Sequence, residues 1–350
     1  MRRTLPDHAG LMLFSELLEI PSPSGHEAQM AGFLAERLAK MGCTPEVDPA
    51  GNVMVRIDGE SGDRPVHCIA AHIDEIGLVV TGIESGGTIR VDRLGGLLPW
   101  KLGETPVEIL GDLGTTIGVV SMGSGHSRTE SRRAPDWSEV LVWTGLSKTQ
   151  LEAKGIRIGS TAVPVRDVRG PFVFGDPRDP WVAAWSFDNR LGVATLLQSL
   201  GKLLREGITP RSPMVIAFTV EEEVGGHGAK ALAQRERLDV FVAIDGSPLV
   251  PECPLELDGR PGIRSQDRAA QYDQRLLAEI RRIAAEAGVE LQPVVYPDAA
   301  SDASLVYSVG ACPRVACLGY VRGSSHGFEV APLVTFDRME SVLTALISQL

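Results

Sequence analysis

The sequence predicts an α/β protein into which a β-rich segment is inserted. Helical periodicity and short apolar strands alternate before Ile76, and the same alternation returns after Gly175. Between these positions, short β-type runs such as TIRVDRL and TTIGVVSMG are separated by glycines, with little helical periodicity. We therefore expect two domains: one formed by residues 1–75 and 176–350, and one formed by the inserted residues 76–175.

The elements expected before the insertion are two helices and two strands. Residues 8–20 have helical periodicity, which resumes in HEAQMAGFLAERLAKMG, where Gly42 ends the helix. GNVMVRIDG has the alternation and the β-branched residues of a strand. PVHCIAAHIDEIG is an apolar run typical of a buried strand, and it emerges into polar residues at His72 to Asp74.

Within the insertion, a Ser147/Gln150 capping box followed by Gly155 predicts one short helix at residues 147–154. The polar residues 124–139 are expected to form a mobile loop. The α/β pattern after the insertion predicts a buried helix at 188–205, strands at 213–220 and 240–245, a helix at about 270–287, strands at 291–296 and 313–319, and a closing helix at 336–348.

The composition argues against several classes of function. The chain has 350 residues, of which 43% are hydrophobic and 23% charged, as in an ordinary globular protein. Its net charge of −11, without a basic patch, argues against nucleic-acid and anionic membrane partners. We expect neither a signal peptide nor a membrane span. The five cysteines form no C-x-x-C motif, which favours reduced thiols in a cytoplasmic protein.

Polar residues follow several of the predicted strands. Ligand sites in open α/β sheets lie beyond the carboxyl ends of the strands, so these residues are candidates for one site. The candidates are His72 and Asp74 after the first buried strand, Glu221, Glu222 and Glu223 after the strand at 213–220, Asp245, His326, and Asp188 at the start of a buried helix.

Each candidate also has an ordinary structural interpretation. Asp188 suits a helix N-cap, the three glutamates suit the first turn of a helix, and a single histidine at a strand end is usually a satisfied polar residue. Together the candidates favour a metal site, because adjacent buried carboxylates repel each other unless a cation is present. A mixed set of histidine and carboxylate ligands suits zinc, cobalt or manganese, and a bridging carboxylate suits a pair of ions.

Five motifs carry a resemblance to a known family. AAHIDEIGLVV, SFDNRLGVATLL, FTVEEEVGGHGAKALA, VAIDGS and SDASLVYSVG resemble, in order and spacing, the M42 family of dinuclear metallo-aminopeptidases. The resemblance implies a zinc-peptidase-like α/β/α sandwich domain with an inserted β-barrel-like domain used in subunit assembly. It also implies two divalent metal ions per chain (zinc or cobalt, with manganese as a third candidate), short peptide substrates, and a homo-oligomer of the tetrahedral dodecamer type.

The resemblance implies a role for each candidate ligand. His72 and Asp245 would each hold one side of the site, and Asp188 would bridge the two metals. Glu223 and His326 would complete the shell of the second metal. In the family, the final histidine commonly precedes a glutamate by four residues, whereas here the glutamate follows three residues after the histidine.

Two further residues receive catalytic roles from the resemblance. Glu222 would be the general base that takes a proton from the attacking water. Asp74, two residues from His72 on the same strand face, would orient the His72 ring. Consecutive glutamates can divide the tasks of ligand and base, because neighbouring side chains point in different directions.

The leading hypothesis is an aminopeptidase that removes N-terminal residues from short peptides. One alternative is a related M20-type metallo-deacylase or carboxypeptidase, and another is a non-catalytic assembly protein of the same fold. The DNR helix start and the β-rich insertion directly after His72 favour the M42 family. The presence of both Glu222 and Glu223 argues against a scaffold, which needs neither residue.

Overall fold

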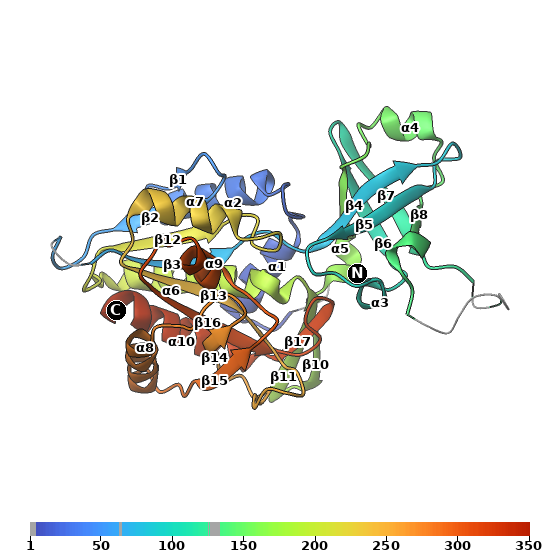
Figure 1. Cartoon of the computed structure of the whole chain (residues 1–350). Coiled ribbons are helices and arrows are strands. Elements are labelled where there is room, and N and C mark those ends of the chain that lie inside the picture. Colours follow the sequence, from blue (N-terminus) through green and yellow to red (C-terminus); the bar gives the residue numbers. More distant parts are fainter. Residues whose placement is uncertain (1–4, 63–64, 125, 127–133) are drawn as a thin grey trace.

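A computed structural model describes residues 5–62, 65–124, 126 and 134–350. Its main sheet has eight strands, and the four central ones run parallel and are almost entirely buried, as their apolar sequences require (Figure 1). In spatial order the strands are β1 (Glu46–Val47), β2 (Val53–Ile57), β12 (Met214–Thr219), β3 (His67–His72), β13 (Val240–Pro248), β16 (Arg314–Arg322), β14 (Gly262–Asp267) and β15 (Gln292–Tyr296).

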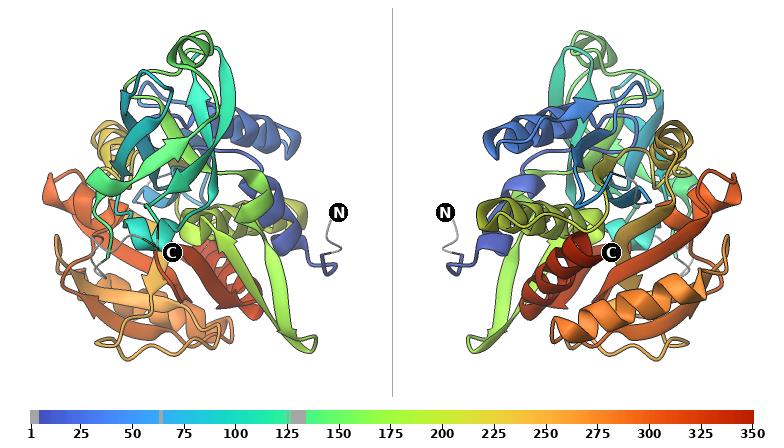
Figure 2. Two further views of the ribbon diagram at one scale, coloured as in Figure 1. Left: turned by 90° about the vertical axis from the view of Figure 1, so that its right-hand side faces the viewer. Right: turned by 90° about the vertical axis from the view of Figure 1, so that its left-hand side faces the viewer.

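Helices cover both faces of this sheet (Figures 1 and 2). The long helix α6 (Phe187–Glu206) is buried along most of its length and packs against α1 (Ala9–Leu18) and α10 (Val334–Gln349), and α10 packs against α8 (Gln274–Glu286). The other face carries α7 (His227–Glu236) and α9 (Asp302–Ser308), which contact each other, while α2 (Ala28–Lys40) packs beside β1 and β2.

Six further strands close into a barrel that projects from one end of the main sheet (Figure 1). The barrel has its own apolar core, separate from the core of the main sheet. Its strands are β4 (Gly77–Ile83), β5 (Ile89–Leu94), β8 (Leu141–Trp143), β7 (Gly114–Ser121), β6 (Pro106–Gly111) and β9 (Thr161–Pro164), with the short helices α3 (Pro99–Leu102), α4 (Lys148–Glu152) and α5 (Arg166–Arg169).

A small antiparallel sheet links the parts of the chain that carry the candidate site. It contains β10 (Phe172–Asp176), β11 (Asp179–Trp185) and β17 (Phe328–Pro332). β11 leads directly into α6, and β17 follows the turn that begins at the end of β16. The pairing of Trp185 with Phe328 therefore brings Asp188 and His326, which are far apart in the sequence, to the same place.

The predicted class, α/β with an inserted barrel, is confirmed. The sequence prediction omits β11 and β17 of the small sheet as well as α7, α9 and β14, because these elements are short or lack a sustained apolar period. Half of the predicted loop at 124–139 lies outside the described residues, and within the described half Trp137–Glu139 forms a single 3₁₀ turn. Within the described ranges, none of the helices combines the length and the apolar character needed to span a bilayer.

Candidate metal centre

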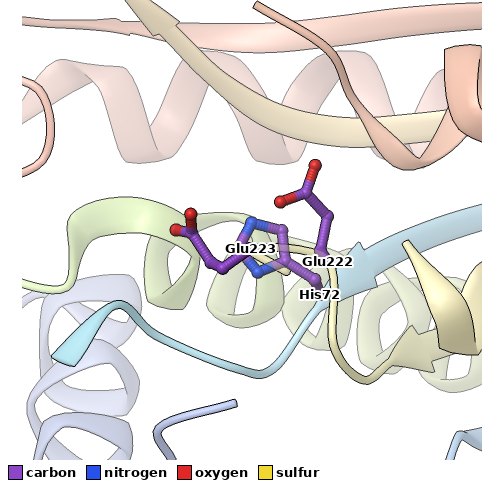
Figure 3. Close-up of side chains that lie close together, drawn as sticks. All are labelled: His72, Glu222 and Glu223. Atoms are coloured by element: carbon purple, nitrogen blue, oxygen red, sulfur yellow. The ribbon is translucent and has the colours of Figure 1, made fainter. Parts of the chain in front are cut away.

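Three neighbouring parallel strands deliver candidate residues to one edge of the main sheet. β3 ends at His72, β12 is followed after Val220 by the glutamates, and β13 carries Asp245. Figure 3 shows the side chains of Glu222 and Glu223 on different sides of the His72 ring. One ligand atom of each of these three residues lies within 4.8 Å of those of the other two. The turn after β12 therefore separates two adjacent glutamates around a single histidine.

A first group of possible ligands contains His72, Asp188 and Asp245, all of them buried. One ligand atom from each residue lies within 4.8 Å of the other two, and His72 Nε2 is 3.2 Å from Asp188 Oδ1. These donors are one imidazole nitrogen and two carboxylate oxygens, which is a donor set that zinc and related ions accept.

A second group contains Asp188, Glu223 and His326. His326 Nε2 lies 3.8 Å from Asp188 Oδ2 and 3.7 Å from Glu223 Oε2. Both separations are shorter than twice a metal–ligand bond of about 2.1 Å, so one ion can contact all three residues. Asp188 belongs to both groups, with Oδ1 toward His72 and Oδ2 toward His326.

His72, Glu222 and Glu223 form a third possible group. Glu222 and Glu223 are thus both within reach of a cation near His72. When Asp188 is shared between the first and second groups, those groups include Glu223 and leave Glu222 free for another role. The structure brings together all five ligands and the base expected from the sequence, and it places Asp74 behind His72.

Burial makes this cluster unfavourable for negative charge. It raises the pKa of Glu223 to about 8 and raises the pKa of Glu222 well above the ordinary glutamate value, with nearby carboxylates adding to both effects. Glu223 Oε1 is buried and has no hydrogen-bond partner among the described residues. A carboxylate oxygen without a partner in a crowded acidic cluster fits a bound cation. The cation offsets the cost of burying the negative charge and the repulsion between the carboxylates.

Positive charge from the protein already enters this cluster. Burial alone raises the pKa of Asp188, but the Arg322 guanidinium and the His72 ring outweigh it and hold that pKa below the ordinary aspartate value. Burial alone lowers the pKa of His72, but hydrogen bonds to Asp188 and Asp74 outweigh it, so the pKa lies well above the ordinary histidine value. The protein thus supplies cations where the two ligand groups meet.

Asp74 connects His72 with the glutamate turn. Its Oδ1 lies 3.3 Å from His72 Nδ1, and its two oxygens accept hydrogen bonds from the backbone N–H groups of Glu222 (3.0 Å) and Glu223 (3.1 Å). The Ser24 hydroxyl donates a further hydrogen bond of 2.7 Å. The Asp74 backbone carbonyl oxygen also lies 3.1 Å from His72 Nδ1. The buried Asp74 thus holds the ring through its carbonyl and its carboxylate, and the same carboxylate holds the turn.

The turn that carries His326 explains how its shifted spacing is accommodated. Ser324 and His326 both have φ near +60°, which tightens the chain between β16 and β17. Glu329 Oε1 accepts a hydrogen bond from the backbone N–H of His326 (3.1 Å), and Oε2 accepts one from the backbone N–H of Asp188 (3.0 Å). Glu329 thus ties His326 to Asp188, although it follows the histidine by three residues.

Two buried arginines of the site are missed by the sequence reasoning. Arg322 pairs with Asp188 and Glu329, and Arg264 Nη2 lies 3.0 Å from Asp245 Oδ2. Arg322 ends the apolar strand β16, which is a signal that could have revealed it, whereas Arg264 lies in the more polar strand β14 and has no such signal. Both line a cavity of about 1010 Å³ together with Gly96 and most of the candidate residues.

A family model matches most of the chain, and several of the similar proteins are named aminopeptidases. The model of the M42 glutamyl aminopeptidase family matches residues 51–341. Glutamyl aminopeptidase of Lactococcus lactis is 30% identical over 237 residues, which are 66% of this chain and 65% of that enzyme. Lysyl aminopeptidase of Pyrococcus furiosus is 27% identical over 240 residues, 67% of this chain and 65% of that enzyme. The matched part thus spans slightly less than two thirds of either relative.

Solved structures match over nearly the whole chain. An aminopeptidase from the archaeon Desulfurococcus kamchatkensis has 26% identity and a TM-score of 0.85, covering 97% of this chain and 94% of that one. The TET1 peptidase of Pyrococcus horikoshii has 25% identity and a TM-score of 0.86, covering 97% and 100%, and it can assemble into a tetrahedron or a large octahedral shell. On the family match, the chain belongs to the M42 glutamyl aminopeptidase family.

Proposed function

We propose that this chain is a metal-dependent aminopeptidase that releases N-terminal residues from short peptides with the help of two divalent ions. The family is one of metal-dependent peptidases, which supports the reaction class. The observation that carries the two-ion centre is that Asp188 belongs to two separate ligand groups in one cavity. A carboxylate with one oxygen toward each group suits a bridging ligand.

In this proposal His72, Asp188 and Asp245 hold one ion, and Asp188, Glu223 and His326 hold the other. Zinc or cobalt suits these imidazole and carboxylate donors, and manganese is a third candidate. A bound pair supplies Lewis acidity, which acidifies a water molecule and stabilises the charge that develops on the substrate carbonyl oxygen.

Glu222 is the proposed general base. It lines the same cavity as the ligands and is not needed in either group that shares Asp188. Burial raises the pKa of its carboxyl group, which suits a residue that accepts a proton from water and then delivers it to the departing amine. The Asp74 carboxylate accepts a hydrogen bond from the backbone N–H of Glu222 and thereby positions Glu222, and it also contacts the His72 ring.

We also propose that residues 76–175 form an assembly domain and that the remaining residues form the catalytic domain. The outer face of the barrel exposes neighbouring apolar side chains on β7 and β8, namely Ile117 (63% exposed), Val119 (48%) and Trp143 (56%). Apolar patches of this kind commonly mark protein contacts. The assembly of the Pyrococcus horikoshii peptidase into a tetrahedron or a large octahedral shell supports a homo-oligomer, and we propose the tetrahedral dodecamer as its form.

A cytoplasmic location completes the proposal. All five cysteines are free thiols, as expected in a reducing compartment.

The test of the function is a scan of aminoacyl-para-nitroanilides with the purified chain, first stripped of metal and then supplied with zinc, cobalt or manganese. We expect hydrolysis that depends on added metal and that ends when the substrate amine is acetylated. Equal release of para-nitroaniline from free and N-acetylated substrates would instead indicate an endopeptidase. Release of acetate from the N-acetylated substrate, with the anilide bond left intact, would indicate a deacylase. A folded chain that binds no divalent ion would overturn the metal centre itself.

A further inference from the structure

The barrel makes a direct hydrogen bond to one of the proposed metal ligands. Gly96 lies just after barrel strand β5, and its carbonyl oxygen is 3.0 Å from His326 Nδ1. A carbonyl can only accept, so Nδ1 must carry the proton of the neutral ring. The lone pair is then on Nε2, which is the atom that faces Glu223 and Asp188.

The contact leaves no room for a side chain at position 96 while the His326 ring keeps its orientation. A Cβ atom added to Gly96 would lie 2.6 Å from both Nδ1 and Cε1 of His326, and its three nearest atoms all belong to that ring. Two neighbouring positions show the same close packing of the barrel segment against the site. A Cβ atom added to Gly95 would lie 3.3 Å from Glu223 Cβ, and a Cβ atom added to Gly327 would lie 3.2 Å from Lys101 Cδ. The loop after β5 therefore packs against the second ligand group.

The two histidines of the centre are thus oriented from different parts of the molecule. His72 is held by Asp74, which follows it on the chain of the main sheet, whereas His326 is held by a backbone group next to the barrel. We propose that Gly96 is a positioning residue that fixes the tautomer and direction of His326, so that the barrel controls one metal group and leaves the other unaffected. This inference rests on the proposed metal centre.

The test is the substitution Gly96→Ala. The backbone of Gly96 does not have the positive φ that disfavours alanine, so the added methyl group acts mainly by displacing the His326 ring. In a calorimetric cobalt titration of metal-free protein, we expect one of two ions to bind about 10–100-fold more weakly, as for loss of an outer-shell partner, while the other is unchanged. Gly86→Ala is the matched control, because it lies in the exposed β4–β5 turn with nothing within 4 Å of its added Cβ.

The variant His326→Ala separates the two possible failures. If His326→Ala still binds both ions as tightly as the parent chain, the ligand assignment is wrong. If it loses one ion but Gly96→Ala binds both normally, the metal centre stands and the role of Gly96 is wrong. If Gly96 acts through His326, the double variant binds no more weakly than His326→Ala alone, because the two effects are not additive.

A second measurement covers the case in which Gly96→Ala does not fold. In a crystal structure of the cobalt-loaded parent chain, we expect Nε2 of His326 at the metal and Nδ1 within hydrogen-bond distance of the Gly96 carbonyl. Coordination through Nδ1, or a ring turned away from Gly96, would overturn the inference.

Discussion

The adjacent glutamates offer a sharp test, because their isosteric amides should fail in different ways. Glu222→Gln keeps the size of the side chain and its capacity for hydrogen bonds, but the amide cannot accept a proton. Glu223→Gln replaces an anionic ligand with a weak neutral one. Both side chains are at the same turn and both have raised pKa values from burial, so local environment alone does not separate them.

The geometry sets the expected magnitudes. Glu223 Oε2 lies 3.7 Å from His326 Nε2 and shares a ligand group with Asp188, so its loss should weaken one ion by more than the roughly 10–100-fold that loss of an outer-shell partner costs. Glu222 is not needed in either group that shares Asp188, so Glu222→Gln should keep both ions. Its turnover should fall by about 10²–10⁴-fold, the usual cost of removing a general base.

The assay is metal content measured beside hydrolysis rate for both variants across a titration with cobalt or zinc. Excess metal should partly restore Glu223→Gln, because its defect is occupancy. Excess metal should not raise the rate of Glu222→Gln, because its defect is proton transfer. The reasoning is refuted if Glu222→Gln sheds metal while Glu223→Gln retains it. In that case the assignment of ligand and base along the three glutamates is displaced by one residue, and Glu221 becomes the candidate base.

Three further predictions concern stability and assembly. Burial raises the pKa of Glu223 to about 8 and that of Asp302 to about 7, so between pH 5 and pH 8 the folded metal-free chain binds more protons than the unfolded chain. Its free energy of unfolding, measured in denaturant titrations, should therefore fall as the pH rises from 5 to 8. Saturating metal should reduce this loss of stability. Arg322→Met should lower the unfolding free energy of the metal-free chain by about 3–5 kcal/mol, because buried carboxylates lose their partner; an unchanged denaturation midpoint would contradict this. Trp143→Glu should give a smaller species by light scattering, whereas Met12→Glu, an exposed position on α1, should not.

The clustering of the candidate ligands could be predicted because it follows simple rules of strand geometry. His72 and the glutamates lie at or just after the carboxyl ends of two neighbouring parallel strands. Asp245 lies level with His72 on the next parallel strand, β13, which continues to Pro248. Asp188 was predictable only as the start of a helix, since an acidic residue there equally suits a cap. Its shared position between two ligand groups depends on how β11 is placed beside β17.

The residues that the sequence reasoning missed are those whose role depends on the arrangement of separate segments. Arg322 appears in the sequence as one charge at the end of an apolar strand, and nothing local shows that it faces Asp188. Gly96 appears as one of two glycines after a strand, and its contact with His326 exists only because the loop after β5 packs against the turn between β16 and β17. Such contacts join residues separated by long stretches of chain.

Asp74 shows how the two ligand groups are kept at a fixed separation. It contacts His72, which belongs to the first group, and it holds the backbone of Glu223, which belongs to the second. Asp74→Asn keeps the size of the side chain but turns one carboxylate oxygen into an amide donor, which cannot accept a hydrogen bond from a backbone N–H. We therefore expect Asp74→Asn to weaken both ions in a cobalt titration, whereas Gly96→Ala weakens one. If Asp74→Asn weakens a single ion, Asp74 serves only the His72 ring, and the glutamate turn must be held by other contacts, such as the hydrogen bond from the backbone N–H of Glu221 to Glu27.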